Sequence, residues 1–251
     1  MKKYIFIIVI LICSGWVAAQ SSKSSSSKGD GGRRLLFGVS IGPTVDWFAP
    51  STTALTRKAP KAGLIAGVNV DVNLVPKDVL YFSTGVFARY LQGDVSFLNE
   101  YRFYINNFLI DETTKTTRTY QTTYLTIPTG IKFRTTPSNG CVFLGKLGLY
   151  HNFKLAGKQF DTFFISGEET DYSITTKKLS NKDAASFAES AYAGLGFEYV
   201  FLKNLRVFAN LDYSCQFNYF KPKQNKVTSN VSNEQFKAII HSMHITVGVM
   251  F

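Results

Sequence analysis

The 251-residue chain has few cysteines, few acidic residues and no long apolar run. Three cysteines are too few for a disulfide scaffold, and a 45% hydrophobic content excludes a disordered acidic chain. The longest apolar segment, residues 4–12, is too short to cross a bilayer as a helix, which excludes a helical membrane protein. Asp and Glu number 17 against 28 Lys and Arg, and the net charge of +11 raises the question of a nucleic-acid partner.

The N-terminus has the features of an export signal. Two lysines precede the apolar segment, and small residues fill positions 17–19. This pattern predicts a signal peptide over residues 1–19, with cleavage before Gln20. A lipoprotein anchor at Cys13 is the disfavoured alternative, because the large Ile12 precedes that cysteine.

Residues 20–34 are rich in Ser, Gly, Lys and Arg and contain nothing that could bury a core. They predict a flexible periplasmic linker. The exported chain would keep only Cys141 and Cys215, so no disulfide framework is expected. Because the basic residues are divided between the signal, the linker and the later segments, they form no continuous basic face, and we expect no nucleic-acid partner.

From residue 35 onward, apolar residues alternate with small or polar ones. The alternation recurs in eight segments, namely 35–47, 64–74, 80–90, 124–134, 143–152, 190–199, 205–216 and 242–251. Each is long enough to cross a membrane as a tilted strand, and most are about twice the usual length of a soluble strand. A soluble β-sandwich would also alternate, but its polar face would not be so rich in Gly, Ser, Thr and Asn.

The connections between these segments alternate in length. Short ones cover residues 75–79, 135–140 and 202–204, and long ones cover residues 48–61, 92–119, 155–186 and 219–237. This arrangement predicts an all-β fold over residues 35–251, an eight-stranded antiparallel up-and-down transmembrane β-barrel in the outer membrane with both mature termini in the periplasm. Aromatic residues near the segment ends fit interfacial girdles, and these are Trp47, Tyr90, Phe133, Tyr199, Tyr213 and Phe251.

The segment YLTIPTGIKFR, residues 124–134, resembles the YLxIPxxxKF strand of the PorT-like outer-membrane barrel family of Bacteroidota. The matching residues are Tyr124, Ile127, Pro128, Lys132 and Phe133. The ending HITVGVMF is similar to the last strand of that family, and Phe251 resembles the C-terminal signal that the barrel-assembly machinery binds. The resemblance covers residues 35–251. It implies an outer-membrane barrel, in a family that includes a component of the type IX secretion system beside many barrels without assigned roles.

Charged residues occur on the predicted lumenal face. Those expected in its periplasmic half are Asp71, Lys132, Arg134, Lys146, Glu198 and Arg206. The interior of an eight-stranded barrel is just wide enough for side chains, so we expect an ion-pair network that closes it. A proton or ion path is the alternative. Asp46 and Arg89 are expected to pair nearer the outer rim.

A catalytic cluster is a second possibility for the lumen. If Asn218 faces Ala238 across the last two strands, Asp212 lies opposite His244, and Ser214 lies opposite Ser242. An acid, a base and a nucleophile in one cavity would suit a hydrolase or acyltransferase, but a hydrogen-bonded lumenal cluster is the favoured interpretation. The remaining histidines, His151 and His241, fall on the opposite face, so we expect neither a metal site nor a cofactor.

The long connections are the expected recognition surface. Thr and aromatic residues in 92–119 favour a hairpin that extends the barrel over a partner-binding loop, and 155–186 predicts similar strand extensions. Lys221, Lys223 and Lys226 either contact lipopolysaccharide or are solvated at the rim, and solvation is favoured. We therefore expect a non-enzymatic structural or interaction barrel whose partners are outer-membrane lipid, the assembly machinery and a protein or secretion complex. An accessory of a type IX secretion or gliding apparatus and a lumenal hydrolase or acyltransferase are the alternatives.

Overall fold

The computed structural model describes residues 35–75, 78–105, 108–163, 172–176, 179, 184–202, 205–218, 220 and 237–251. The predicted signal peptide, the predicted linker and the three lysines of the last long connection lie outside these residues. Within the described ranges, no helix is both long enough and apolar enough to cross a membrane.

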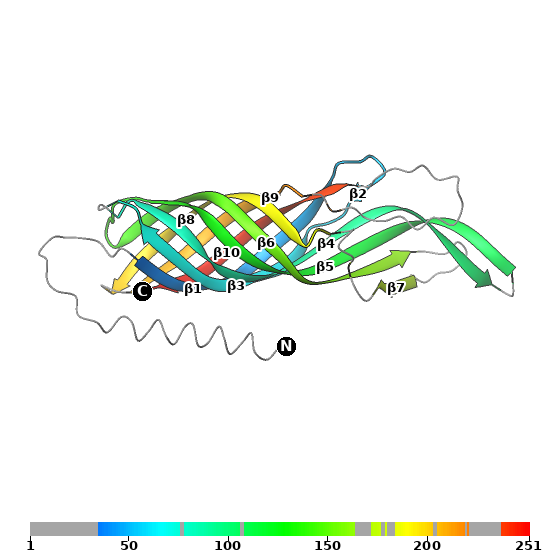
Figure 1. The fold of residues 1–251 in the computed structure, drawn as a ribbon, viewed down its shortest axis with the longest axis horizontal. Coiled ribbons are helices and arrows are strands. Elements are labelled where there is room, and N and C mark those ends of the chain that lie inside the picture. Colours follow the sequence, from blue (N-terminus) through cyan, green and yellow to red (C-terminus); the bar gives the residue numbers. More distant parts are fainter. Residues whose placement is uncertain are drawn as a thin grey trace, which may run out of the picture. The chain divides into compact units, whose positions relative to one another are not determined.

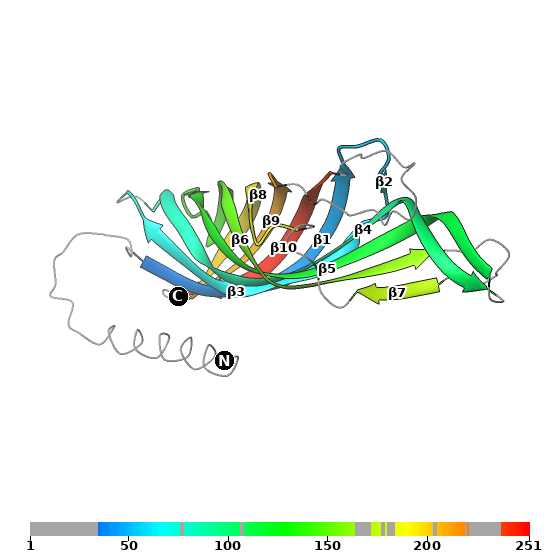
Figure 2. The ribbon, with the colours of Figure 1, turned by 45° about the vertical axis from the view of Figure 1, so that its right-hand side comes forward.

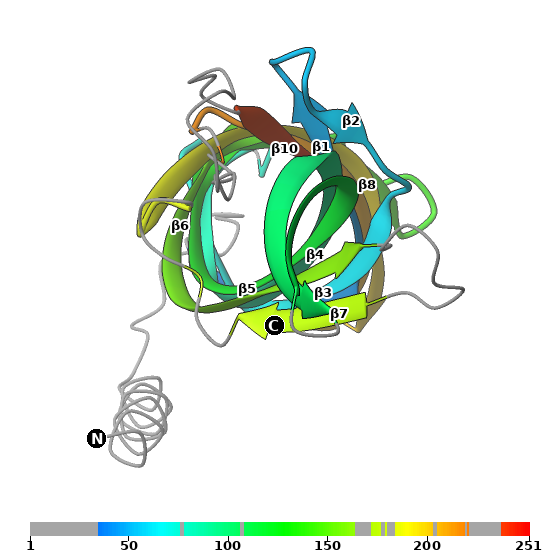
Figure 3. The ribbon, with the colours of Figure 1, turned by 90° about the vertical axis from the view of Figure 1, so that its right-hand side faces the viewer.

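Eight long strands of the described chain form a closed barrel, which is seen from the side in Figure 1 and along its length in Figure 3. They are β1 (Leu35–Pro50), β3 (Lys61–Asn73), β4 (Leu80–Ile105), β5 (Phe108–Arg134), β6 (Cys141–Phe163), β8 (Phe187–Leu202), β9 (Leu205–Gln216) and β10 (Ala238–Met250). Each strand pairs antiparallel with the next, and β1 pairs with β10 to close the sheet. The predicted fold class is confirmed.

The period of two along the strands separates an outer from an inner face. Outward side chains such as Val39, Val86 and Val247 are large, apolar and exposed. Inward side chains such as Ser40 and Thr246 are polar and buried. Apolar side chains on the outside and polar side chains on the inside are typical of a barrel surrounded by lipid. The closed sheet also suits lipid, because it pairs the polar backbone groups of its strands with one another.

One short turn has a sequence that dictates its geometry. Asn139 and Gly140 have φ of 51° and 80°, which is the left-handed region that Asn and Gly tolerate best. The flanking residues Ser138 and Cys141 exchange two backbone hydrogen bonds of 2.9 Å. This Asn-Gly turn fixes the register of β5 against β6.

Strands β4, β5 and β6 continue well beyond the closed part of the barrel (Figure 2). Pairing of β3 with β4 ends at Leu64–Tyr90, whereas β4 and β5 stay paired as far as Ile105 and Phe108. The hairpin predicted within 92–119 is therefore confirmed, and the strands predicted over 80–90 and 124–134 are too short. The pairing of β4 with β5 continues past the points at which the sequence analysis ended the two strands.

The predicted connection 155–186 is also partly strand. It contains the end of β6 and the short β7 (Tyr172–Thr176), which pairs with β6. The short β2 (Thr56–Arg57) pairs with β4, along the edge of β4 that does not face β5. We call the parts of β4, β5 and β6 beyond the closed barrel, together with β7, the extension.

An apolar cluster lies where the extension leaves the barrel. Leu55, Leu179 and Phe220 come from three different connections and belong to one buried cluster with Phe48 and Tyr120. The rings of Phe48, Tyr120 and Phe220 meet edge to face, with centroids 5.1–5.6 Å apart. Such aromatic contacts bury large apolar surfaces, so the cluster gives this end of the described barrel an apolar interior.

Candidate functional site

The lumen holds an ion-pair network centred on Glu198 of β8. Its carboxylate binds Lys132 Nζ and Arg134 Nη2 at 2.6 Å each, and Arg206 Nη1 lies 3.8 Å away. Lys132 Nζ also binds Asp71 at 2.7 Å. All five residues point inward because each has the inward parity of its strand. The network joins four strands, β3, β5, β8 and β9, across the lumen.

The network is buried and supported by neighbouring aromatic rings. Glu198 has no exposed surface, and the exposed fractions of Lys132 and Arg134 are 4% and 5%. Arg134 donates to the Tyr81 hydroxyl at 3.1 Å and stacks on the same ring at 5.2 Å. Buried charges are tolerated only when they are paired and hydrogen-bonded, as these are.

Lys146, which was predicted to belong to this network, lies elsewhere. Its Nζ binds Asp212 of β9 at 2.9 Å. In the described structure no ion pair joins Lys146 to the five residues of the Glu198 network. The strand parity predicted that Lys146 points inward, but parity carries no information about height along the barrel. The expectation of a single six-residue network is therefore wrong, because Lys146 forms a separate pair.

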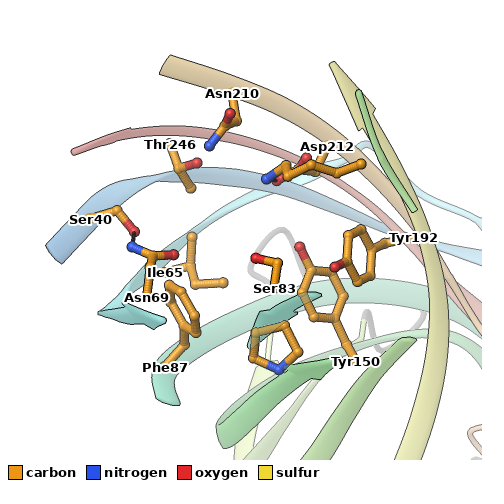
Figure 4. Close-up of a pocket in the computed structure, with 12 residues that line it drawn as sticks. Ser40, Ile65, Asn69, Ser83, Phe87, Tyr150, Tyr192, Asn210, Asp212 and Thr246 are labelled. Carbon is orange, nitrogen blue, oxygen red and sulfur yellow. Dashed lines mark hydrogen bonds and ion pairs between the residues drawn. The ribbon is translucent and has the colours of Figure 1, made fainter. Parts of the chain in front are cut away.

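A small cavity adjoins this separate pair in the middle of the lumen (Figure 4). Its volume is about 40 Å³, and side chains from all eight barrel strands line it. Ser40, Asn69, Ser83 and Asn210 contribute polar groups beside Lys146 and Asp212. A polar cavity of this size holds about three water molecules and is too small for a lipid or a peptide.

A second buried pair lies nearer the extension. Arg89 Nη2 binds Asp46 at 2.9 Å and donates to Ser242 Oγ at 2.5 Å. Asp46 also accepts a hydrogen bond of 2.8 Å from Thr44. The predicted partners Asp46 and Arg89 are thus brought together with a residue of the proposed catalytic cluster.

The proposed catalytic cluster has the predicted register but lacks its central contact. His244 lies opposite Asp212, and Ser242 lies opposite Ser214. Ser214 Oγ is 3.2 Å from His244 Nε2, but His244 Nδ1 has no hydrogen-bond partner in the described structure. His244 stacks on Tyr150 at 5.5 Å. The arrangement is a Ser–His pair without the carboxylate that would orient the imidazole.

The other two histidines lie on the outward face, as expected. His151 is 2.9 Å from Thr129 Oγ1 and 3.2 Å from Glu189 Oε1. His241 stacks on Trp47. Within the described residues, no three His, Cys, Asp or Glu side chains gather in a way that could hold a metal ion.

Sequence analysis missed one buried ion pair in the extension. Arg118 Nε and Nη2 bind the two carboxylate oxygens of Asp161 at 2.5 and 2.6 Å. Burial disfavours the charged guanidinium, but the hydrogen bonds and charge of Asp161 outweigh it and raise the pKa of Arg118. The guanidinium also stacks on Phe97 at 5.0 Å. Both residues fell in segments predicted as connections.

The residues that resemble the PorT-like strand motif lie on β5. Tyr124, Pro128 and Lys132 point inward, and Ile127 and Phe133 point outward. Pro128 has no amide hydrogen, and Thr84 Oγ1 donates to its carbonyl at 2.8 Å. Phe251 exchanges backbone hydrogen bonds of 2.8 and 3.1 Å with Phe37, so the last residue completes the pairing of β10 with β1.

Comparison with solved structures finds low identity and limited superposition. Ail, the attachment invasion locus protein of Yersinia pestis, has 13% identity and a TM-score of 0.36, over 87% of this chain and 100% of that one. Neisserial surface protein A has 12% identity and a TM-score of 0.40, over 85% and 95%. The outer membrane protease OmpT from Escherichia coli has 10% identity and a TM-score of 0.38, over 92% and 99%. None of the curated proteins compared with the chain matches it.

A family comparison covers nearly the whole chain. The family described as "Outer membrane protein beta-barrel domain" matches residues 18–250. This range includes every strand of the closed barrel. The chain therefore belongs to the outer membrane protein beta-barrel domain family.

Proposed function

We propose that this outer-membrane β-barrel protein is a non-enzymatic structural or interaction component. In this proposal the N-terminus and the C-terminus of the barrel domain both lie on the periplasmic side of the membrane. The extension projects from the outer surface toward a partner. The observation that carries the proposal is the filled lumen. The Glu198 network, the Arg89–Asp46 pair and the apolar cluster around Phe48 occupy the described lumen, and the cavity beside Lys146 and Asp212 has a volume of about 40 Å³.

The extension supports the interaction part of the proposal. Three barrel strands continue into it, so it is held by the same backbone pairing as the barrel. Its Arg118–Asp161 pair adds a buried, bidentate contact between β5 and β6. A projecting sheet with these supports is pre-organised, which reduces the entropy lost when a partner binds.

Site-specific photo-crosslinking in intact cells tests the interaction. We expect a crosslinker at Leu155, which is 63% exposed and lies beyond the last β6–β8 pair, to capture a protein. The matched control is Leu195, which is 73% exposed on the lipid-facing side of β8 and should capture lipid alone. Equal recovery of protein at both positions, or at neither, would contradict the proposal.

Two further measurements separate a closed barrel from a channel and fix its direction. In planar bilayers the purified chain should carry no steady current, and a stable conductance would favour the proton or ion path. An epitope tag after Thr53 should be reached by antibody in intact cells, whereas a tag at Asn139 should be reached only after permeabilisation. The reverse pattern would overturn the proposed orientation.

The resemblance of residues 124–134 to PorT-like barrels favours one specific partner class. On this alternative the barrel is an accessory of a type IX secretion or gliding apparatus. Co-purification of secretion components with the Leu155 crosslink product would support it, and partners unrelated to export would exclude it.

The Ser214–His244 contact is the observation that favours a lumenal hydrolase or acyltransferase. The weakness of this candidate is the position of Asp212, whose carboxylate binds Lys146.

A further inference from the structure

Four side chains gather on the outward face near the end of β1. They are Trp47 of β1, Arg57 of β2, Tyr213 of β9 and His241 of β10, and we call them the Trp47 cluster. Trp47 is directly opposite His241 in the β1–β10 pairing. Trp47 and Tyr213 have the same parity as the exposed apolar residues Val45 and Leu211, which places the cluster on the lipid-facing side.

The rings of the Trp47 cluster form a continuous stacked surface. Trp47 and His241 stack with centroids 5.8 Å apart and planes 12° apart, and Tyr213 lies beside both, 5.9 Å from His241 and 6.3 Å from Trp47. The guanidinium of Arg57 lies over the Trp47 ring, 5.6 Å from its centroid. Aromatic rings with polar edges are enriched where a membrane meets water, because one part of the ring is apolar and another can be hydrated.

The polar groups of the cluster are donors that lack an acidic partner. The side chain of Arg57 makes no ion pair or hydrogen bond to any other described residue, whereas nearby Lys61 binds Asp94 at 3.0 Å. The Tyr213 hydroxyl lies 2.6 Å from His241 Nδ1. When this hydroxyl donates to Nδ1, the imidazole proton is on Nε2, which leaves an N–H donor in the cluster.

We propose that the Trp47 cluster binds the phosphate of a phosphorylated glycolipid in the outer leaflet. Arg57 supplies the charge and the forked donors that suit a phosphate, and its stacking on Trp47 leaves those donors free. The acyl chains of the same lipid would lie along the exposed apolar side chains of β1, β9 and β10. The assignment to the outer leaflet rests on the orientation proposed above, whereas the phosphate site itself rests on the cluster.

Lipid binding to the purified full chain in detergent tests the site. The probes are bisphosphorylated lipid A and the same lipid with both phosphates removed, and native mass spectrometry measures the bound fraction. We expect the wild-type chain to prefer the phosphorylated lipid and Arg57→Gln to weaken its binding about tenfold, since a charge-assisted contact is lost.

The control is Lys58→Gln, which removes the same charge one residue away. Among the described contacts Lys58 makes none to the cluster, so its binding should stay within about twofold of wild type. Heat-modifiable mobility on a gel should show that both variants are folded. Equal binding of the two lipids, or equal weakening by both substitutions, would overturn the site.

The epitope-tag experiment distinguishes failure of this site from failure of the proposed orientation. If the chain shows no preference for the phosphorylated lipid while antibody reaches the tag after Thr53 on intact cells, the phosphate site at the Trp47 cluster is refuted and the proposed orientation stands. Retained phosphate preference with that tag hidden from the outside refutes the outer-leaflet source, because the cluster would then face the inner leaflet.

Discussion

Asp212 lies directly opposite His244 on the neighbouring strand, yet its carboxylate binds Lys146 Nζ at 2.9 Å and leaves His244 Nδ1 without a hydrogen-bond partner in the described structure. The same three residue types that suggested a catalytic triad are therefore divided between two contacts. Ser214 and His244 make one, and Asp212 and Lys146 make the other.

This division predicts an inert Ser214. A fluorophosphonate probe should not label it in the folded barrel, because the imidazole is not oriented by a carboxylate and the adjoining cavity is only about 40 Å³. Asp212→Asn and His244→Ala should leave lipid and peptide turnover unchanged. Labelling that disappears in Ser214→Ala would establish the lumenal enzyme instead.

Glu198 should be the most sensitive carboxylate of the barrel. Glu198→Gln leaves Lys132 and Arg134 buried without their shared counter-charge, and we expect a loss of about 3–5 kcal/mol in the free energy of unfolding. Urea unfolding in detergent, followed by heat-modifiable mobility, measures it. The control is Glu189→Gln, because the Glu189 side chain is 42% exposed and should contribute less than about 1 kcal/mol. Similar losses for both variants would mean that the network does not stabilise the barrel.

Gly194 provides the space in which the Asp212 carboxylate lies. A Cβ at this position would collide with Asp212 Oδ1 and would come within 3.0 Å of the Leu211 carbonyl oxygen of β9. We expect Gly194→Ala to destabilise the barrel by about 1–3 kcal/mol. Gly145→Ala is the matched control, because a Cβ there meets no atom within 4 Å. Thermal unfolding of the two variants in one detergent compares them, and an equally stable Gly194→Ala would show that the Asp212 side chain can shift away without cost.

Asp161→Asn should loosen the extension and leave the closed barrel intact. Arg118 and Asp161 join β5 to β6 beyond the last β6–β8 pair, so removing one charge acts on the extension alone. Limited proteolysis should cut the extension of the variant at least tenfold faster, which corresponds to about 1.4 kcal/mol or more in its opening free energy. Lys61→Gln breaks a partly exposed pair and should not change the cutting rate. Faster cutting within the closed barrel would contradict this separation.

The alternation of residue types predicted the barrel well because lipid and lumen impose opposite requirements on successive residues. It also placed Asp212 opposite His244 once a register was assumed. Strand parity cannot give the shear of the barrel, however, and the shear decides which inward charges lie at the same height. For this reason the separate pairing of Lys146 could not be predicted.

The Arg118–Asp161 pair was missed for a different physical reason. The β5–β6 register shifts between Thr123 and Tyr124, where Leu155 is an extra residue on β6. Such a bulge reverses the parity of everything that follows, so Asn152 and Asp161 both point inward although their numbers differ in parity. Alternation continued past this point would have placed Asp161 on the outside.

The pairing of β1 with β10 has a consequence for how the barrel is made. Gly38 is opposite Met250, so the ladder that completes the cylinder joins the first and last strands of the described chain. Until β10 has been synthesised and delivered, two strand edges stay open, and each is a template for misassociation with another chain. A chain that ends before Ala238 should therefore remain protease-sensitive and prone to association, because the edges of β1 and β9 would have no partner strand.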